Sequence, residues 1–237
     1  MKLVKMGLAL VMAVAGFNAV QAQTADEIIT KYLVAQGGKD KLEQVKTLHM
    51  ENTTQAMGNE GPSTVNIISG TGYKLASDFS GQSIIMVITD KGGWQVNPYG
   101  GATTPTALPD EVLKQSQSQL DIYPLLNYAA KGSKVELTGK EAGAYKLKVT
   151  DKNGSENNYF IDSATYHIVK SSATANFMGQ NMEVTSSYSD FKPADMGIVF
   201  PYSVEISYGG QFSVTTTVKI IEINKTIDPS IFVMPKS

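Results

Sequence analysis

The chain has 237 residues and a formal net charge of −2 at pH 7, and its 20 basic residues are all lysine. It contains no cysteine, which excludes disulfides and thiolate metal sites. A mildly acidic chain without arginine is a poor candidate for binding nucleic acid or for bidentate recognition of phosphate.

Residues 1–22 have the pattern of a secretory signal peptide. Two lysines come before an apolar run over residues 6–17, and small residues stand one and three positions before Gln23. The run is shorter than the roughly 20 residues that a membrane-spanning helix needs. We therefore expect cleavage after Ala22, export of residues 23–237 as a single domain, and no transmembrane segment in the mature chain.

Residues 24–36 are predicted to form an amphipathic helix. Thr24 and Glu27 match the capping-box pattern, in which each side chain bonds the backbone N–H of the other residue. A glycine pair at 37–38 ends the helix, because glycine adopts the left-handed conformation easily, and a short helical turn follows over 39–45. The inward stripe of the first helix is Ile28, Ile29, Tyr32 and Leu33.

Alternating apolar and polar residues predict strands over most of the remaining chain. Residues 47–57 are predicted as the first strand. Residues 63–77 are predicted as one strand in which Gly70 and Gly72 indicate bulges or strong curvature. Residues 98–109 are predicted as a loop. The later predicted strands are 134–138, 144–150, 157–162, 166–176, 181–192, 198–208 and 211–224.

The hairpin over residues 80–98 is expected to organise the sheet. A strand over 84–89 is apolar on both faces, which indicates a position inside the sheet with an apolar cover over each face. The turn is predicted over 90–93, where Gly92 and Gly93 supply positive φ values. The strand carries on one face Ile84, Met86 and Ile88, and on the other Ile85 and Val87.

Residues 108–130 are predicted as a helical cover for the inner face of this sheet. A proline and two acids at its start suit a helix N-terminus, and Pro124 must break or kink it. Its inward side chains are Leu113, Leu120, Leu125 and Leu126. At the end of the chain, the tail is expected to dock Ile231 and Phe232.

Roughly ten strands at hairpin spacing cannot form a flat sheet, because sheets of that size curl. We therefore predict an α+β fold that is mainly β. A curved antiparallel sheet of roughly ten strands forms an incomplete barrel, which is covered by the N-terminal helix and by a mid-chain helical lid.

Four segments carry a resemblance to a known family: DKGGWQVNP at 90–98, LPDEVLK at 108–114, VFPYSVE at 199–205 and DPSIFVMP at 228–235. With them, the chain resembles the exported outer-membrane lipoprotein-sorting proteins of Bacteroidetes-type bacteria, which belong with the LolA-like lipoprotein carriers. The resemblance implies an incomplete barrel, a periplasmic location and an apolar cavity that receives lipid or the acyl chains of lipoproteins. Such carriers hold their lid closed through an arginine, so the latch of this chain stays unassigned.

The cavity is expected between the two-faced strand and its helical cover. Each candidate residue has an ordinary core role as its alternative, and Trp94 is expected either at the cavity mouth or in the core. We assign to the cavity Ile84, Met86, Ile88, Trp94, Leu113, Leu120, Leu125 and Leu126.

Catalytic and metal-binding patterns are absent from the sequence. His49 and His167 fall on separate predicted strands with no acid at a telling spacing, and no zinc-type or nucleophile-elbow motif occurs. Both histidines are expected to be solvated or hydrogen-bonded. We therefore expect no enzyme activity, no cofactor and no metal.

Two turns carry motif-like patterns. Residues 151–154 begin like a calcium loop but are predicted as a hairpin turn, because a strand precedes the acid expected at the loop's end. Residues 162–164 match a three-residue O-glycosylation pattern centred on Ser163, and an ordinary turn is the alternative.

The function predicted from these features is that of a periplasmic carrier or binder of lipid or lipoprotein acyl chains. The alternative is an envelope protein that uses the surface of the half-barrel to bind other proteins, with its interior filled and no lipid ligand.

Overall fold

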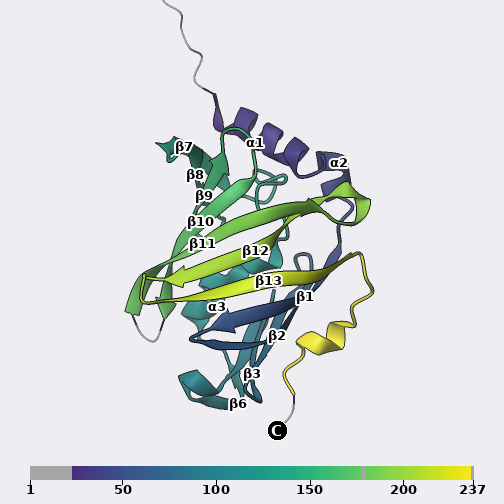
Figure 1. Cartoon of the computed structure of the whole chain (residues 1–237), viewed down its shortest axis with the longest axis vertical. Coiled ribbons are helices and arrows are strands. Elements are labelled where there is room, and N and C mark those ends of the chain that lie inside the picture. The colour runs from purple at the N-terminus through teal and green to yellow at the C-terminus, as the bar shows by residue number, and fades with distance from the viewer. Residues whose placement is uncertain (1–22, 178–179, 236–237) are drawn as a thin grey trace, which may run out of the picture.

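The computed structural model describes residues 23–177 and 180–235, and the predicted signal peptide lies outside this part of the chain. Within the described residues, thirteen strands form one antiparallel sheet that curves without closing into a barrel (Figure 1). The predicted mainly β fold is confirmed, although the sheet has more strands than expected. The strands are β1 (Thr47–Ala56), β2 (Asn59–Ile68), β3 (Gly72–Phe79), β4 (Gln82–Thr89), β5 (Gly92–Asn97), β6 (Ala102–Ala107), β7 (Lys134–Glu141), β8 (Ala144–Thr150), β9 (Glu156–Asp162), β10 (Ile168–Phe177), β11 (Gln180–Pro193), β12 (Val199–Tyr208) and β13 (Phe212–Ile223).

Short helices complete the fold. The α-helices are α1 (Ala25–Ala35), α2 (Lys39–Leu42) and α3 (Asp110–Ser116), and the 3-10 helices are η1 (Pro98–Gly100), η2 (Gln117–Leu120), η3 (Asp195–Gly197) and η4 (Pro229–Phe232). In Figure 1, α1 lies across one end of the molecule and α3 lies behind the sheet.

The strand order across the sheet is β6-β5-β4-β3-β2-β1-β13-β12-β11-β10-β9-β8-β7. Neighbouring strands follow one another in the chain except at β1 and β13, where the first strand pairs with the last. The two edge strands, β6 and β7, are connected by residues 108–133, which we call the lid segment. Because this segment travels from one edge of the sheet to the other, it crosses one face, which we call the inner face.

Two strand predictions were wrong. The stretch predicted as one strand over 63–77 is the hairpin β2–β3, because Gly70 adopts a φ of 71° and turns the chain. The predicted loop over 98–109 contains β6, which pairs with β5 at the edge of the sheet. Pro105 is tolerated in β6 because an edge strand has a side on which no ladder hydrogen bond is needed.

The turn between β4 and β5 also differs from its prediction. It lies at residues 90–91, and neither Gly92 nor Gly93 has a positive φ. A Cβ atom on Gly93 would stand 2.7 Å from Leu108 Cδ1 and 3.2 Å from Leu113 Cδ1. The missing side chain of Gly93 therefore lets the lid segment approach β5 closely.

The capping box of α1 is confirmed. The Glu27 backbone N–H donates to Thr24 Oγ1 at 3.2 Å, and the Thr24 backbone N–H donates to Glu27 Oε2 at 2.9 Å. Both bonds satisfy donors that a helix N-terminus otherwise leaves unpaired. The predicted stripe faces inward, with Ile28, Ile29 and Tyr32 buried.

The lid segment is helical only in its first half, whereas a helix was predicted to residue 130. Helix α3 and η2 end at Leu120, and turns follow to residue 133. Asp121 Oδ1 accepts a hydrogen bond from the Tyr123 backbone N–H at 3.1 Å, and Pro124 comes next, so the chain leaves the helical path. This path lets the adjacent Leu125 and Leu126 pack into different parts of the core.

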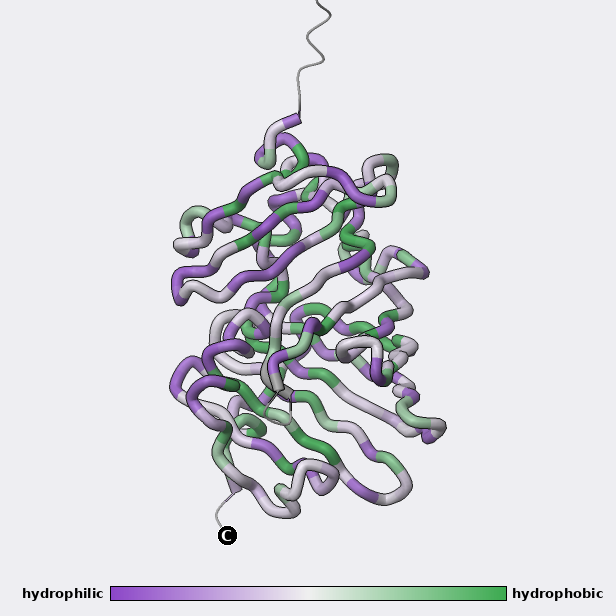
Figure 2. Tube along the Cα trace, turned by 90° about the vertical axis from the view of Figure 1, so that its left-hand side faces the viewer, coloured by the Kyte–Doolittle hydropathy of each residue, from purple (hydrophilic) through white to green (hydrophobic). Residues whose placement is uncertain are grey.

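Both faces of β4 are covered, as predicted. Met86 and Ile88 pack against the lid segment, whereas Val87 packs with Trp94 and Phe232 on the outer face. The tail docks through Phe232, which is buried, as expected. Figure 2 shows how apolar and polar residues are distributed along the strands. Strand β4 packs on both faces because its residues 84–88 are all apolar.

The two motif-like turns are ordinary Asx-type turns. Asp151 Oδ1 accepts hydrogen bonds from the backbone N–H groups of Asn153 and Ser155, at 2.8 and 2.9 Å, which confirms the hairpin turn. Asp162 caps the β9–β10 turn that contains Ser163, accepting from Thr165 N–H at 2.7 Å. Glycosylation of Ser163 stays a prediction.

Candidate functional site

The α1 end of the inner face is filled. By the α1 end we mean the hydrophobic cluster in which side chains of α1 and of the lid segment pack on β8 and β9. Leu125, Leu147 and Ile161 are completely buried there, each with an exposed fraction of 0%. The buried members are Ile28, Ile29, Tyr32, Leu125, Leu147, Val149 and Ile161. This part of the interior is a conventional close-packed core.

The α3 end of the inner face is less completely covered. By the α3 end we mean the hydrophobic cluster in which α3 and η2 lie on β3 and β4. Ile88, Leu108 and Leu120 are buried, and the partly buried side chains packed against them are Tyr73, Met86, Val112 and Leu113. Helix α3 itself has no buried residue. It also approaches β10, so it spans the open side of the half-barrel between two distant parts of the sheet.

Half-buried apolar side chains continue from the α3 end along the inner face. The register places Leu75 beside Met86 on the neighbouring strand, and Val65 and Met50 follow in the same row. The rows beyond them reach β11, β12 and β13. The half-buried members are Met50, Leu75, Ile84, Met86, Val184, Val204, Ile206 and Val214. We call this set the half-buried wall.

Three of the hydrogen bonds between described residues hold the lid segment to the sheet and its turns. Gln117 Nε2 donates to the Thr89 carbonyl oxygen at 3.1 Å. Gly70 N–H donates to the Leu120 carbonyl at 2.8 Å, and Leu108 N–H donates to the Gly93 carbonyl at 2.9 Å. Gln117 is therefore a side-chain latch that sequence reasoning missed, because nothing in the sequence distinguishes it from the glutamines beside it.

A polar hollow of about 390 Å³ lies beyond the end of η2. It is bordered by Gln117 and Leu120 on one side and by the β8–β9 turn on the other. Lys131 Nζ donates to Asp121 Oδ2 at 2.6 Å and to the Tyr123 carbonyl at 2.9 Å within this region. Most of the residues that line it are polar, so it does not match the apolar cavity that the sequence predicted.

Five of the predicted cavity residues lie at or beside the α3 end. Four of them, Met86, Ile88, Leu113 and Leu120, belong to its cluster. The fifth, Ile84, lies on the same face of β4 as Met86 and Ile88 but outside that cluster. Whether they contact a ligand stays a prediction.

The other three predicted residues lie elsewhere. Trp94 is opposite Val87 and so points to the outer face, where its Nε1–H donates to the Phe232 carbonyl at 2.9 Å. Leu125 belongs to the α1 end, and Leu126 packs in the central core. The alternative that Trp94 is a core residue therefore describes its position.

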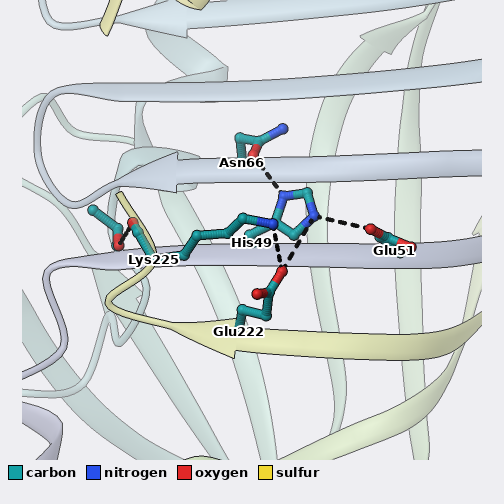
Figure 3. Close-up of polar contacts among 6 residues, drawn as sticks. His49, Glu51, Asn66, Glu222 and Lys225 are labelled. Atoms are coloured by element: carbon teal, nitrogen blue, oxygen red, sulfur yellow. Dashed lines mark hydrogen bonds and ion pairs between the residues drawn. The ribbon is translucent and has the colours of Figure 1, made fainter. Parts of the chain in front are cut away.

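His49 lies on the outer face and is hydrogen-bonded, as predicted (Figure 3). Its Nδ1 is 2.7 Å from Asn66 Oδ1, and its Nε2 is 3.4 Å from Glu51 Oε1. Glu222 Oε2 is 3.8 Å from the same Nε2. A hydrogen bond from Lys225 lowers the pKa of the Glu222 carboxyl, so this carboxylate stays charged.

His167 is also hydrogen-bonded, at the C-terminal end of α1. Gln36 Nε2 donates to its Nδ1 at 3.0 Å, and the ring stacks on Phe191 with centroids 4.5 Å apart. Among the described residues, no three histidine or acidic side chains are gathered so that they could hold a metal ion. In the same part of the chain, no helix is long and apolar enough to cross a membrane.

Buried tyrosine hydroxyls add neutral polar groups to the interior. Burial raises the pKa of Tyr73 and Tyr159 far above the ordinary value of 10.0, so both hydroxyls stay protonated at neutral pH. Tyr188 Oη lies 2.9 Å from Ser171 Oγ. The interior therefore offers uncharged hydrogen-bonding groups, which suits a neutral or apolar guest better than an ion.

Several solved structures share the fold of this chain, and three of them are compared with it. A LolA superfamily protein from Nitrosomonas europaea matches with a TM-score of 0.57 and 13% identity, over 90% of this chain and 98% of that one. A domain described as outer membrane lipoprotein-sorting, from Vibrio parahaemolyticus, matches with a TM-score of 0.54 and 12% identity, over 87% and 94% of the two chains.

The third is a DUF1329 family protein from Desulfovibrio piger, with a TM-score of 0.54 and 11% identity over 87% of this chain and 97% of that one. No protein-family model matches the chain, and no curated protein matches it. The chain therefore has a LolA-like fold, as its sequence predicted, and at these identities the likeness concerns the fold alone.

Proposed function

We propose that this chain is a non-enzymatic periplasmic carrier or binding protein for lipid or for the acyl chains of lipoproteins, exported by the signal peptide at residues 1–22. The observation that carries this proposal is the half-buried wall beneath and beside α3. The LolA-like fold supports it, because a domain of this fold is described as lipoprotein-sorting.

The physical basis is apolar surface that the chain's own side chains leave half covered. Burying a CH₂ group stabilises a complex by about 0.8 kcal/mol, so a long acyl chain that covers this wall gains several kcal/mol after the costs of association. Helix α3 has no buried residue, so it can move aside without exposing a core of its own. Met50 and Met86 add flexible side chains that adapt to different chains.

The first experiment is to purify residues 23–237 from the native host without detergent. Organic extraction followed by mass spectrometry is expected to find lipid that co-purifies with the protein. After delipidation, a fluorescent fatty acid is expected to bind and to be displaced by unlabelled fatty acid. Protein that is lipid-free as isolated and does not bind the probe would refute the proposal.

Two isoleucines provide a matched test of where the guest binds. Ile84 lies on the inner face in the half-buried wall, whereas Ile220 is exposed on the outer face, opposite Glu51. Ile84→Lys is expected to weaken probe binding by about tenfold or more, because the acyl chain would then desolvate a charge. Ile220→Lys is expected to leave binding unchanged.

A second inner-face variant controls for misfolding. Leu113 lies on α3, which has no buried residue, so Leu113→Lys is expected to fold with a nearly unchanged unfolding midpoint while losing probe affinity. Equal binding by both lysine variants of the inner face and by Ile220→Lys would place the guest elsewhere.

A further inference from the structure

A polar stripe interrupts the apolar inner face. Asn52 on β1 is opposite Ser63 on β2, and Ser63 is opposite Ser77 on β3. Thr54 is the next inward residue on β1. These four side chains are among the most deeply buried polar groups in the described chain, with exposed fractions of 6% for Asn52, 3% for Ser63, 8% for Ser77 and 6% for Thr54.

The hydroxyls in and beside this stripe bond one another. Thr54 Oγ1 lies 2.7 Å from Ser63 Oγ and 3.2 Å from Thr216 Oγ1 on β13. These short contacts satisfy hydroxyl groups that would otherwise be buried without partners. The hydroxyls of Thr54 and Ser63 are therefore accounted for by this network.

Asn52 is the exception. Its Oδ1 is buried and has no hydrogen-bond partner among the described residues. Native proteins rarely leave a buried acceptor unpaired, and such a group points to a ligand or an ordered water. Because carbonyl oxygens of side-chain amides only accept hydrogen bonds, the missing partner must be a donor.

The surroundings of Asn52 indicate where that donor comes from. Along β1, Asn52 follows Met50 on the inner face, and across the sheet it pairs with Val218 of β13. It therefore lies within the sheet face that carries the half-buried wall, not on the outer face with His49. A guest that covers Met50 and its neighbours passes beside the Asn52 side chain.

We infer that the chain binds an apolar ligand that carries a hydrogen-bond donor, namely an acyl chain with a hydroxyl group, and that Asn52 Oδ1 accepts from that hydroxyl. This inference rests on the proposed function and narrows its ligand class. An unsubstituted chain leaves the acceptor unpaired as it is in the free protein, whereas a hydroxylated chain gains one buried hydrogen bond, so the site favours the hydroxylated chain.

The test is a displacement titration with palmitic acid and with a set of monohydroxylated palmitic acids that differ in the position of the hydroxyl. For the unmodified protein, at least one hydroxylated acid is expected to displace a fluorescent fatty acid about tenfold more effectively than palmitic acid does. One additional buried hydrogen bond gives a difference in affinity of about this size. Equal displacement by all the acids would overturn the inference while leaving the proposed function standing.

Two variants test whether the preference for a hydroxylated acid depends on Asn52. Asn52→Leu has nearly the same shape without the acceptor, so it is expected to lose the preference for the hydroxylated acid while binding palmitic acid at least as well. Asn66→Leu, on the outer face of the neighbouring strand, is the control and is expected to keep the preference. A preference that survives Asn52→Leu would overturn the inference.

The outcomes separate the two proposals. If none of the acids binds the unmodified protein, the proposed function fails and the inference fails with it. If Asn52→Leu does not fold, the comparison of palmitic and hydroxylated acids on the unmodified protein decides alone.

Discussion

The two ends of the inner face are covered by helices of opposite character. Helix α1 has a side-chain capping box and three buried residues, and it packs on side chains that are completely buried. Helix α3 has no side-chain cap and no buried residue. Beneath it, the three buried side chains of the α3 end are surrounded by apolar side chains that are only partly buried. One sheet therefore carries both a sealed core and a loosely covered apolar surface.

This difference shows how the fold can be stable and still leave room for a guest. The α1 end supplies close packing, which holds the curved sheet together. The α3 end contributes less to packing, so its cover can move at low cost. Regions of low local stability are where binding segments are generally found.

The strongest test of this comparison is truncation at each end. Leu125→Ala at the α1 end is expected to lower the free energy of unfolding by about 2–5 kcal/mol, because it opens a cavity in a close-packed site. Met86→Ala at the α3 end is expected to cost about 1 kcal/mol, because the site is half-buried and can collapse. Urea unfolding followed by circular dichroism measures both, and equal costs would contradict the comparison.

The next largest effect is expected from removing the Gln117 side chain, which holds the lid segment to β4. Gln117→Ala removes the side-chain hydrogen bond to the Thr89 carbonyl and is expected to cost about 0.5–1.5 kcal/mol locally. Amide hydrogen exchange is expected to become faster in α3 and η2 and to stay unchanged in α1. Gln119→Ala, at an exposed position of the same 3-10 helix, is the control. Unchanged exchange in the Gln117 variant would show that the lid segment is held without this side-chain hydrogen bond.

The smallest expected effect is a pH dependence of the free energy of unfolding, which arises from His167 near the C-terminal end of α1. Burial lowers the pKa of His167 below its ordinary value of 6.5, with Asp162 opposing the shift. The folded state then binds the proton less tightly than the unfolded state does. This contribution to stability is present above about pH 6.5 and is lost as the pH falls through the lower folded-state pKa.

Urea unfolding at about pH 7.5 and about pH 5.5 measures this loss. Protonation also converts the His167 Nδ1 from an acceptor of the Gln36 hydrogen bond into a second donor. His167→Gln is expected to show a smaller change in midpoint between the two conditions. The same change in both proteins would assign the pH dependence to other groups.

The candidate site was predictable where periodicity alone decides which side chains share a face. Ile84, Met86 and Ile88 alternate along one strand, and Leu113 lies in a segment that opens with helix-start residues. These local patterns brought Met86, Ile88, Leu113 and Leu120 to the α3 end and placed Ile84 on the same face. Trp94 follows the same alternation, but periodicity does not say which face of its strand the distant Phe232 covers.

The lid segment and its surroundings also show where local sequence patterns stop predicting the structure. Pro124 predicted an interruption, but not that the chain beyond it would send Leu125 and Leu126 into separate clusters. Gly93 was assigned to turn geometry, whereas its role is to make room for Leu108 and Leu113. Asn52 looked like an ordinary strand residue, because the loss of its hydrogen-bond partners depends on what lies across the sheet.

The sequence by itself determined the local structure of this protein. The capping box and the alternating strands follow from short-range chemistry, and together they indicate a curved, mainly β fold. Only the tertiary structure decided that β1 pairs with β13, that the lid segment joins the two edges of the sheet, and that α3 stays loosely seated. These features depend on contacts between residues far apart in the chain, and no local period encodes which distant surface will cover a given face.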